Sequence, residues 1–277
     1  METVLITGCS SGIGAATARA FLEEDWTVYA TARNPDDITD LAEEGCETAA
    51  LDVTDDEEVE AVVDRIVEET GRIDALVNNA GYAQYGPIED ASVRDVHRQF
   101  DVNVYGPHRL TRAVLPHMRD RGEGAIVNVS STVGRIAHPM GGVYCGSKAA
   151  LEAMSDALRV EAGGFGVDVV LIEPGSVTSS FYDRADEEVT DGGERTEAYD
   201  GLYRAFEDAK LILGEGPLAI EPEDVARKIL HAASCTDPAP RYTVGTMARV
   251  GVLARFLPDR WRDAAFRFGA KLARFSR

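Results

Sequence analysis

Three side chains in the middle of the chain have the types and spacing that suit proton transfer to or from a substrate oxygen. Tyr144 follows Ser131 by thirteen positions, and Lys148 follows Tyr144 by four. If residues 143–163 form a helix, the tyrosine and the lysine lie one turn apart on the same face. The ammonium then lowers the pKa of the phenol from about 10 towards neutrality. Such a phenol can protonate a carbonyl or take a proton from an alcohol, while Ser131 hydrogen-bonds the same oxygen.

A tyrosine followed at four positions by a lysine is more often a solvated surface pair, so this interpretation depends on what precedes it. The chain begins with an apolar run at residues 3–7, a glycine-rich loop and a helical pattern over 15–24. Gly8 permits a tight turn, Gly12 permits close approach of the backbone to a pyrophosphate, and Gly14 permits close packing of helix on strand. The start of the helix attracts the anion. Strand, loop and helix together predict nucleotide binding.

Composition limits the other functions. The 277 residues suit one α/β domain, with 28 Lys and Arg against 48 Asp and Glu and a net charge of −20. An acidic surface with only four lysines disfavours binding to nucleic acids. It is typical of proteins from salt-accumulating halophiles, although an ordinary acidic bacterial protein is the alternative.

Cysteines and histidines give no sign of a disulfide framework or of a metal site. The four cysteines are scattered without a C-x-x-C pair, which suits reduced thiols in the cytoplasm. The five histidines have no ligand spacing, so we expect no metal. Neither a signal peptide nor an apolar run long enough to span a bilayer is recognised.

Strand and helix patterns alternate, which predicts a doubly wound parallel sheet in a three-layer α/β/α domain over residues 1–247. The expected strands are 3–7, 26–31, 47–51, 74–77, 125–130, 167–172 and 241–244, and the expected helices are 15–24, 55–70, 92–104, 105–120, 143–163 and 223–233. The alternation breaks at residues 176–220, which are polar, rich in carboxylates and interspersed with aromatic side chains. A long insertion at this edge of an open sheet predicts a mobile substrate lid with helical pieces, and a solvated excursion without a role is the alternative.

Residues 248–277 form a separate basic segment. Eight cations and two carboxylates give it a net charge of +6 and leave −26 on the first 247 residues. Apolar residues recur at helical spacing, at Trp261, Ala265, Phe268, Leu272 and Phe275. This amphipathic helix either lies on a membrane surface or packs on its own acidic domain, and the abundance of carboxylates in the same chain favours the second.

Together these motifs resemble the single-domain branch of the short-chain dehydrogenase/reductase family, over residues 3 to about 245. The family's T-G-x-x-x-G-x-G signature corresponds to residues 7–14, and its N-N-A-G segment to residues 78–81. Pro174, Gly175 and Thr178 are assigned to its nicotinamide-contacting P-G-x-x-x-T segment.

The resemblance implies a Rossmann fold and hydride transfer between a nicotinamide coenzyme and a substrate. The catalytic residues that it implies are Asn103, Ser131, Tyr144 and Lys148. The coenzyme-binding residues are Gly8, Ser10, Ser11, Gly12, Ile13, Gly14, Arg33, Asp52, Val53, Asn79, Ala80, Gly81, Tyr144, Lys148, Pro174, Gly175, Val177 and Thr178. In the family pattern Lys148 also holds the nicotinamide ribose, and Asn103 holds a water in a proton relay to Lys148.

The end of the second expected strand predicts a preference for NADP(H). An NAD-selective member carries a carboxylate there for the ribose hydroxyls, whereas this chain has Ala32. Arg33 follows with a fork of donors that suits a 2′-phosphate, unless it pairs with Asp36 or Asp37. Ser10 and Ser11 occupy the glycine loop where a second basic residue sometimes stands, so we expect moderate discrimination.

Residues 31–35, 103–107 and the C-terminal segment resemble the 17β-hydroxysteroid-dehydrogenase-like group. The sequence therefore predicts a cytoplasmic NADP(H)-dependent oxidoreductase acting on CH–OH groups and the corresponding carbonyls of hydrophobic substrates, in a homodimer or homotetramer from a halophilic archaeon. Two alternatives remain open: a membrane-surface acyl-lipid ketone reductase anchored by residues 248–277, and a non-catalytic NADP(H)-sensing protein on the same fold.

Overall fold

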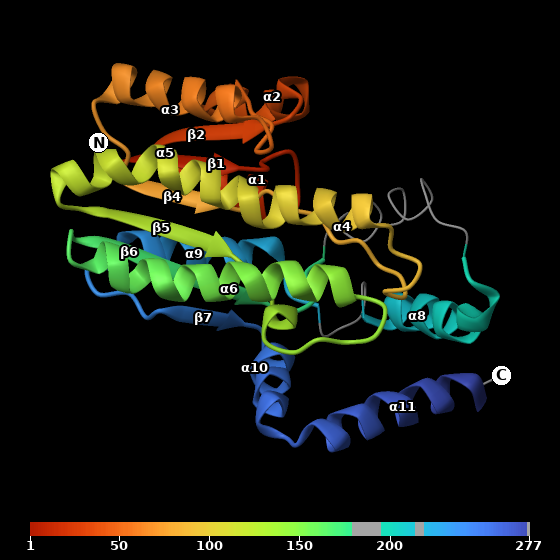
Figure 1. Cartoon of the computed structure of the whole chain (residues 1–277). Helices are drawn as coiled ribbons and strands as arrows, with labels where there is room; N and C mark the ends of the chain where they lie inside the picture. The colour runs from red at the N-terminus through yellow and green to blue at the C-terminus, as the bar shows by residue number, and fades with distance from the viewer. Residues whose placement is uncertain (179–194, 214–218, 276–277) are drawn as a thin grey trace.

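The computed structural model of the chain describes residues 1–178, 195–213 and 219–275 (Figure 1). The strands are β1 (Thr3–Thr7), β2 (Thr27–Ala32), β3 (Glu47–Ala50), β4 (Ala75–Asn78), β5 (Gly124–Val129), β6 (Val167–Pro174) and β7 (Arg241–Val244). They form one parallel sheet in the order β3-β2-β1-β4-β5-β6-β7. The predicted doubly wound sheet is confirmed, and every expected strand is present to within two residues at each end.

Helices cover both faces of this sheet (Figure 1). One layer holds α1 (Gly12–Leu22), α2 (Thr39–Glu44) and α9 (Pro222–Ser234), and the other holds α3 (Asp56–Thr70), α5 (Gly106–Arg121) and α6 (Gly142–Gly163). Val4 and Ile6 of β1 belong to the core under the first layer, whereas Leu5 belongs to the core under the second. Successive side chains of a strand point to opposite faces, so a strand covered on both sides is apolar throughout.

Local residues fix the ends of the helices. The Asp55 carboxylate accepts hydrogen bonds from the backbone N–H groups of Glu57 and Glu58 at the start of α3. Gly71 ends the same helix with φ of 72°, in the left-handed region where a glycine carries no steric cost. These two caps explain why the sequence pattern located α3 within a residue.

The helical pattern over residues 92–120 folds differently from the two helices expected there. The chain forms α4 (Val93–Phe100), a π-helical turn (Asp101–Tyr105) and then α5. A wider turn leaves the polar and apolar periodicity unbroken, so the sequence pattern does not reveal it. Gly106 follows at a close contact, because a Cβ on it would lie 2.8 Å from a methyl carbon of Val53. The short α2 was also not expected.

Beyond β7 the chain leaves the sheet through α10 (Thr246–Leu253), a 3-10 turn (Ala254–Phe256) and α11 (Asp259–Phe275). In Figure 1, α11 runs outside the two helix layers, beside α8 (Asp200–Leu213). Trp261, Ala265 and Phe268 on the expected apolar face are all exposed. The helix α11 thus lies against α8 of its own domain, and this contact leaves these three side chains exposed. The side chains of Leu272 and Phe275, on the same expected face, are not described. None of the helices in the described ranges is long and apolar enough to cross a membrane.

Candidate active site

A cleft of about 490 Å³ lies at the carboxyl ends of β1, β4, β5 and β6. This is the edge where open α/β sheets bind their ligands. Most of the sequence-predicted site residues line it: Gly8, Ser10, Ser11, Gly12, Ile13, Arg33, Asp52, Val53, Asn79, Ala80, Gly81, Ser131, Tyr144, Lys148, Pro174, Gly175 and Val177. Gly14, Asn103 and Thr178 do not line it.

The glycine loop forms a cradle into which no side chain would fit. Gly8 and Gly12 have φ of 72° and 55°, which L side chains rarely adopt. A Cβ on Gly8 would lie 2.8 Å from the Cα of Ala80, and a Cβ on Gly14 would lie 2.2 Å from the carbonyl oxygen of Gly8. Gly14 therefore acts behind the cleft, where it lets α1 approach the loop. The first N–H groups of α1 are left for an anion.

Side chains from β1 and β4 hold this cradle in place. The Asn79 amide donates to the carbonyl oxygens of Thr7 and Gly8, at 2.9 and 3.0 Å. The Thr7 hydroxyl accepts from the backbone N–H groups of Asn79 and Ala80, at 3.1 and 3.0 Å. The second asparagine of the N-N-A-G segment thus ties two strand ends together.

The far end of the cleft is bounded by the ends of β2 and β3. Arg33 is exposed at this edge, and among the described residues it has no ion-pair partner. Asp37 instead accepts a hydrogen bond from the Asn34 amide at 3.2 Å. Asp52 accepts from the N–H and hydroxyl of Thr54, so it caps the strand end while it lines the cleft.

Tyr144 and Lys148 project from α6 into the same cleft, where both are 6% exposed. The Lys148 ammonium donates to the carbonyl oxygen of Val129 at 2.8 Å. Burial lowers the pKa of this ammonium to about 8, and the Glu152 carboxylate partly opposes the change. Ser131 caps a 3-10 turn (Thr132–Gly134) at the end of β5. A hydroxyl, a phenol and a perturbed ammonium therefore face one cavity, the arrangement that proton transfer requires.

Asn103 lies behind the cleft, in the π-helical turn. Its amide nitrogen donates to the carbonyl oxygen of Tyr82 at 2.9 Å and to the Ser147 hydroxyl at 3.1 Å, and its oxygen accepts from the Tyr82 N–H. A Cβ on Gly81 would lie 3.0 Å from the Asn103 side-chain oxygen and 3.7 Å from the Lys148 nitrogen. The bare backbone at Gly81 is what allows these two side chains to approach one another.

An aromatic group beside Tyr144 was missed by the sequence analysis. The Tyr85 ring centroid lies 6.1 Å from that of Tyr144, 6.2 Å from that of His138 and 4.8 Å from that of Phe206 in α8. Tyr85 lies in an irregular loop without periodicity, so its sequence position carried little signal beyond its closeness to the N-N-A-G segment.

The helical pieces expected within residues 176–220 are present where the structure describes this segment, as a 3-10 turn (Glu197–Tyr199) and α8. The Asp90 carboxylate holds them to the loop before α4, because it accepts hydrogen bonds from the hydroxyls of Thr196 and Tyr203 at 2.6 and 2.7 Å. The rest of the expected lid, residues 179–194 and 214–218, lies outside the described residues.

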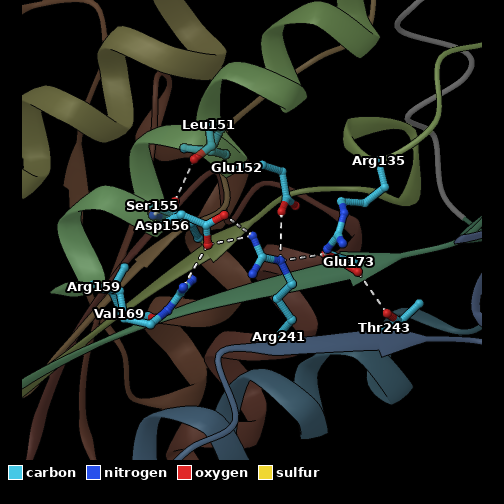
Figure 2. Close-up of polar contacts among 11 residues, drawn as sticks. Arg135, Leu151, Glu152, Ser155, Asp156, Arg159, Val169, Glu173, Arg241 and Thr243 are labelled. Carbon is cyan, nitrogen blue, oxygen red and sulfur yellow. Dashed lines mark hydrogen bonds and ion pairs between the residues drawn. The ribbon is translucent and has the colours of Figure 1, made fainter. Parts of the chain in front are cut away.

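A buried ionic cluster lies beneath the site (Figure 2). Arg241 of β7 contacts Glu152 of α6 and Glu173 of β6, each at 3.2 Å. Arg135, directly after the turn capped by Ser131, contacts Glu173 at 2.7 Å. The cluster thus joins the loop that carries Ser131 to the helix that carries the tyrosine and the lysine. In the sequence, the sign of this cluster is Glu173, a carboxylate inside the apolar strand β6.

Thr178 requires a correction. It follows Pro174 by four positions, one short of the P-G-x-x-x-T spacing, and the matching position 179 lies outside the described residues. Its side chain is exposed, and its N–H donates to the carbonyl oxygen of Ile220 at 3.0 Å. Among the described residues of this segment, Pro174, Gly175, Ser176 and Val177 line the cleft. Among the described residues, no three His, Cys, Asp or Glu side chains come together in a group that could hold a metal ion.

Curated relatives cover nearly the whole chain. An uncharacterised oxidoreductase of Escherichia coli, YbbO, is 37% identical over 95% of this chain and 93% of its own length. A 3-ketodihydrosphingosine reductase of Bacteroides thetaiotaomicron is 33% identical over 96% of this chain and 97% of its own length.

Solved structures agree with this likeness. A short-chain dehydrogenase from Streptomyces avermitilis is 33% identical with a TM-score of 0.81, over 100% of this chain and 98% of that chain. A serine dehydrogenase complexed with NADP+ is 30% identical with a TM-score of 0.77, over 88% and 95% of the two chains. A Burkholderia phymatum enzyme complexed with NAD is 24% identical with a TM-score of 0.77, over 91% and 90%. Of the last two neighbours, one is therefore complexed with NADP+ and the other with NAD.

Residues 2–189 match the family described as short chain dehydrogenase. The glycine cradle, strands β1 to β6 and the Ser131–Tyr144–Lys148 group all lie within that match, and β7 follows it. This chain is an oxidoreductase of the short-chain dehydrogenase/reductase family.

Proposed function

We propose that the protein transfers a hydride between NADP(H) and a ketone, an aldehyde or a secondary alcohol. The observation that supports this most is that a buried lysine with a lowered pKa lies one helical turn from a buried tyrosine, in the same cleft as the glycine cradle. A protein that only sensed the coenzyme would have no use for a buried proton donor beside it.

The chain's own groups suit each part of the reaction. The cradle with Asn79, Arg33, Asp52 and the segment at 174–177 would hold NADP(H), which supplies or accepts the hydride when it is bound. Tyr144 gives a proton to the developing alkoxide in reduction and takes it back in oxidation. Ser131 hydrogen-bonds and orients the same oxygen, and Lys148 favours the ionised phenol. Asn103 positions this group from behind, through Tyr82 and Ser147.

We assign the preference for the phosphorylated coenzyme to Arg33. It follows Ala32 at the tip of β2, lies at the cleft edge and has no ion-pair partner within the described ranges, so its fork of donors is available to a 2′-phosphate. Ala32 provides no carboxylate to repel that phosphate. Ser10 and Ser11 add no second cation, which points to moderate discrimination.

We infer a hydrophobic carbonyl substrate, as in the 17β-hydroxysteroid-dehydrogenase-like group. Tyr85 and His138 line the cleft beside Tyr144, and Phe206 of α8 contacts Tyr85. Aromatic rings give apolar contact to a bulky substrate. The relative named as a 3-ketodihydrosphingosine reductase fits this class.

The surface supports a halophilic, cytoplasmic setting. An excess of carboxylates and few lysines keep a hydrated surface soluble at high salt, where repulsion between the carboxylates is screened.

Three exposed apolar side chains suit the pairing of two copies of the chain through α5 and α6. They are Tyr105, directly before α5, and Met154 and Val160 on α6.

A substrate panel tests the proposed activity directly. Absorbance of NADPH is followed in molar KCl with steroid, acyl-lipid and simple aliphatic ketones. We expect consumption of NADPH with at least one hydrophobic ketone. Tight binding of NADPH without turnover on any of these ketones would contradict the assignment and support a coenzyme sensor.

A further inference from the structure

The C-terminal helices carry a group of large apolar side chains that the rest of the described protein does not cover. The C-terminal apolar surface consists of Leu253, Phe256, Leu257, Trp261 and Phe268. Phe256 and Trp261 are 78% and 70% exposed. Trp261 and Phe268 lie seven positions apart on one face of α11, and exposed apolar side chains that share a face mark interaction sites.

This surface lies in the most basic part of the chain. Residues 248–277 carry a net charge of +6, whereas the first 247 residues carry −26. The two carboxylates of this segment are already paired within α11, Asp259 with Arg262 and Asp263 with Arg267. Cations therefore dominate around the apolar side chains.

We propose that the C-terminal apolar surface docks on an anionic lipid bilayer. A helix with tryptophan and phenylalanine on one face and arginines around them lies in the interface of such a bilayer, where the rings enter the headgroup region and the arginines meet lipid phosphates. The strongly acidic body is repelled by the same surface. At low ionic strength these two opposite charges favour one orientation, with α11 against the lipid and the sheet away from it.

The charges favour lipid over a second copy of the chain. Two copies that met through this surface would bring two segments of +6 together, which costs free energy. The acidic body of the same chain leaves the five side chains of this surface exposed. Arg262 and Arg267, the described arginines of α11 that form ion pairs, pair with carboxylates of the same helix and not with carboxylates of the body.

The same segment begins at the rim of the cleft. The Gly175 N–H donates to the carbonyl oxygen of Val244 at 3.1 Å, and a Cβ on Gly175 would lie 3.1 Å from the Ala248 side chain. Docking would therefore hold the cleft near the lipid surface, which a hydrophobic substrate reaches first. This last step rests on the proposed function, whereas the docking itself does not.

Sedimentation with vesicles tests the docking in the full-length protein. Vesicles of equal parts phosphatidylglycerol and phosphatidylcholine are compared with phosphatidylcholine alone, at the lowest KCl concentration that preserves the circular dichroism of the folded state. We expect the wild type to sediment with the anionic vesicles. Trp261→Ser/Phe268→Ser should lower the partition coefficient at least about tenfold, because less apolar area enters the interface. The matched control is Val93→Ser/Phe165→Ser, which changes two exposed apolar residues elsewhere and should sediment like the wild type.

The proposal would be overturned if the wild type did not sediment with anionic vesicles, or if the Trp261→Ser/Phe268→Ser variant sedimented as strongly as the wild type. It would also be overturned if the wild type bound no vesicles but formed a dimer in analytical ultracentrifugation that this variant did not form. NADPH turnover on a water-soluble ketone is measured in parallel. Loss of turnover in all proteins would count against the proposed function and leave the docking result standing.

Discussion

Replacing the buried Lys148 with methionine should stabilise the protein at neutral pH while it removes activity. The lysine is 6% exposed, and its ammonium donates to the carbonyl oxygen of Val129. Folding therefore takes a charge out of water, which costs free energy unless partners compensate for it. Methionine has a similar length and carries no charge.

The lowered pKa sets the size of the effect. The ammonium titrates near 10.5 in the unfolded chain and at about 8 in the folded protein. At about 1.4 kcal/mol for each pKa unit, burial of the charged form costs about 3 kcal/mol below pH 8. Methionine also gives up the hydrogen bond to the Val129 carbonyl, worth about 1 kcal/mol. Lys148→Met should therefore raise the free energy of unfolding by about 2 kcal/mol at pH 7.

The sign of the pH dependence makes this prediction specific. From pH 8 to 10.5 the unfolded wild type binds a proton at Lys148 that the folded protein does not, so the free energy of unfolding of the wild type rises with pH. The advantage of the variant should shrink over this window and vanish or reverse above it. Groups that do not interact with Lys148 titrate alike in both proteins and cancel in the difference.

Urea unfolding in KCl, followed by circular dichroism at several pH values from 7 to 10.5, measures this difference. Lys228→Met is the matched control, because it removes an exposed lysine from α9 and should give a difference that stays flat with pH. A variant less stable than wild type at pH 7, or a difference that does not change with pH, would refute the reasoning.

Three further predictions concern the coenzyme, the surface and the ionic cluster. Arg33→Ala should raise the KM for NADPH and leave the KM for NADH nearly unchanged. The control is Arg112→Ala, on the exposed face of α5. If Arg33→Ala changed both KM values equally, Arg33 would not be the residue that binds the 2′-phosphate. The melting temperature should rise from about 0.1 M to about 2 M KCl as carboxylate repulsion is screened, and a flat or falling curve would contradict the halophilic assignment. Glu152→Gln should move the alkaline decline of kcat/KM to lower pH, because the Glu152 carboxylate raises the pKa of Lys148. If the dependence of kcat/KM on pH did not change, Glu152 would have a structural role only.

Much of the fold and site could be predicted because the signals are local. The strands of a sheet covered on both faces are short apolar runs, such as residues 4–6, and the ends of α3 have recognisable caps at Asp55 and Gly71. The cradle requires bare glycines at fixed spacing. Tyr144 and Lys148 lie four positions apart, so a single helical turn is enough to place their side chains on the same face.

The parts that escaped prediction depend on contacts between distant residues or on a change of helical pitch. Arg241 meets Glu152 and Glu173 only because β7 lies at the edge of the sheet beside β6 and below α6. The π-helical turn at 101–105 preserves the polar pattern that had predicted plain helix. The contact of Tyr85 with Phe206 joins an irregular loop to α8, far apart in the sequence.

The central claim, that Tyr144 transfers the proton, is tested most directly by Tyr144→Phe. The substitution removes one hydroxyl and leaves the glycine cradle untouched, so the Kd for NADPH should stay near that of the wild type. Tyr105→Phe, which changes an exposed tyrosine outside the cleft, is the control and should keep full activity. We expect turnover of the best ketone by Tyr144→Phe to fall below about a hundredth of the wild-type rate, the usual scale of a lost general acid. Turnover above about a tenth of that rate, with coenzyme binding intact, would contradict the claim.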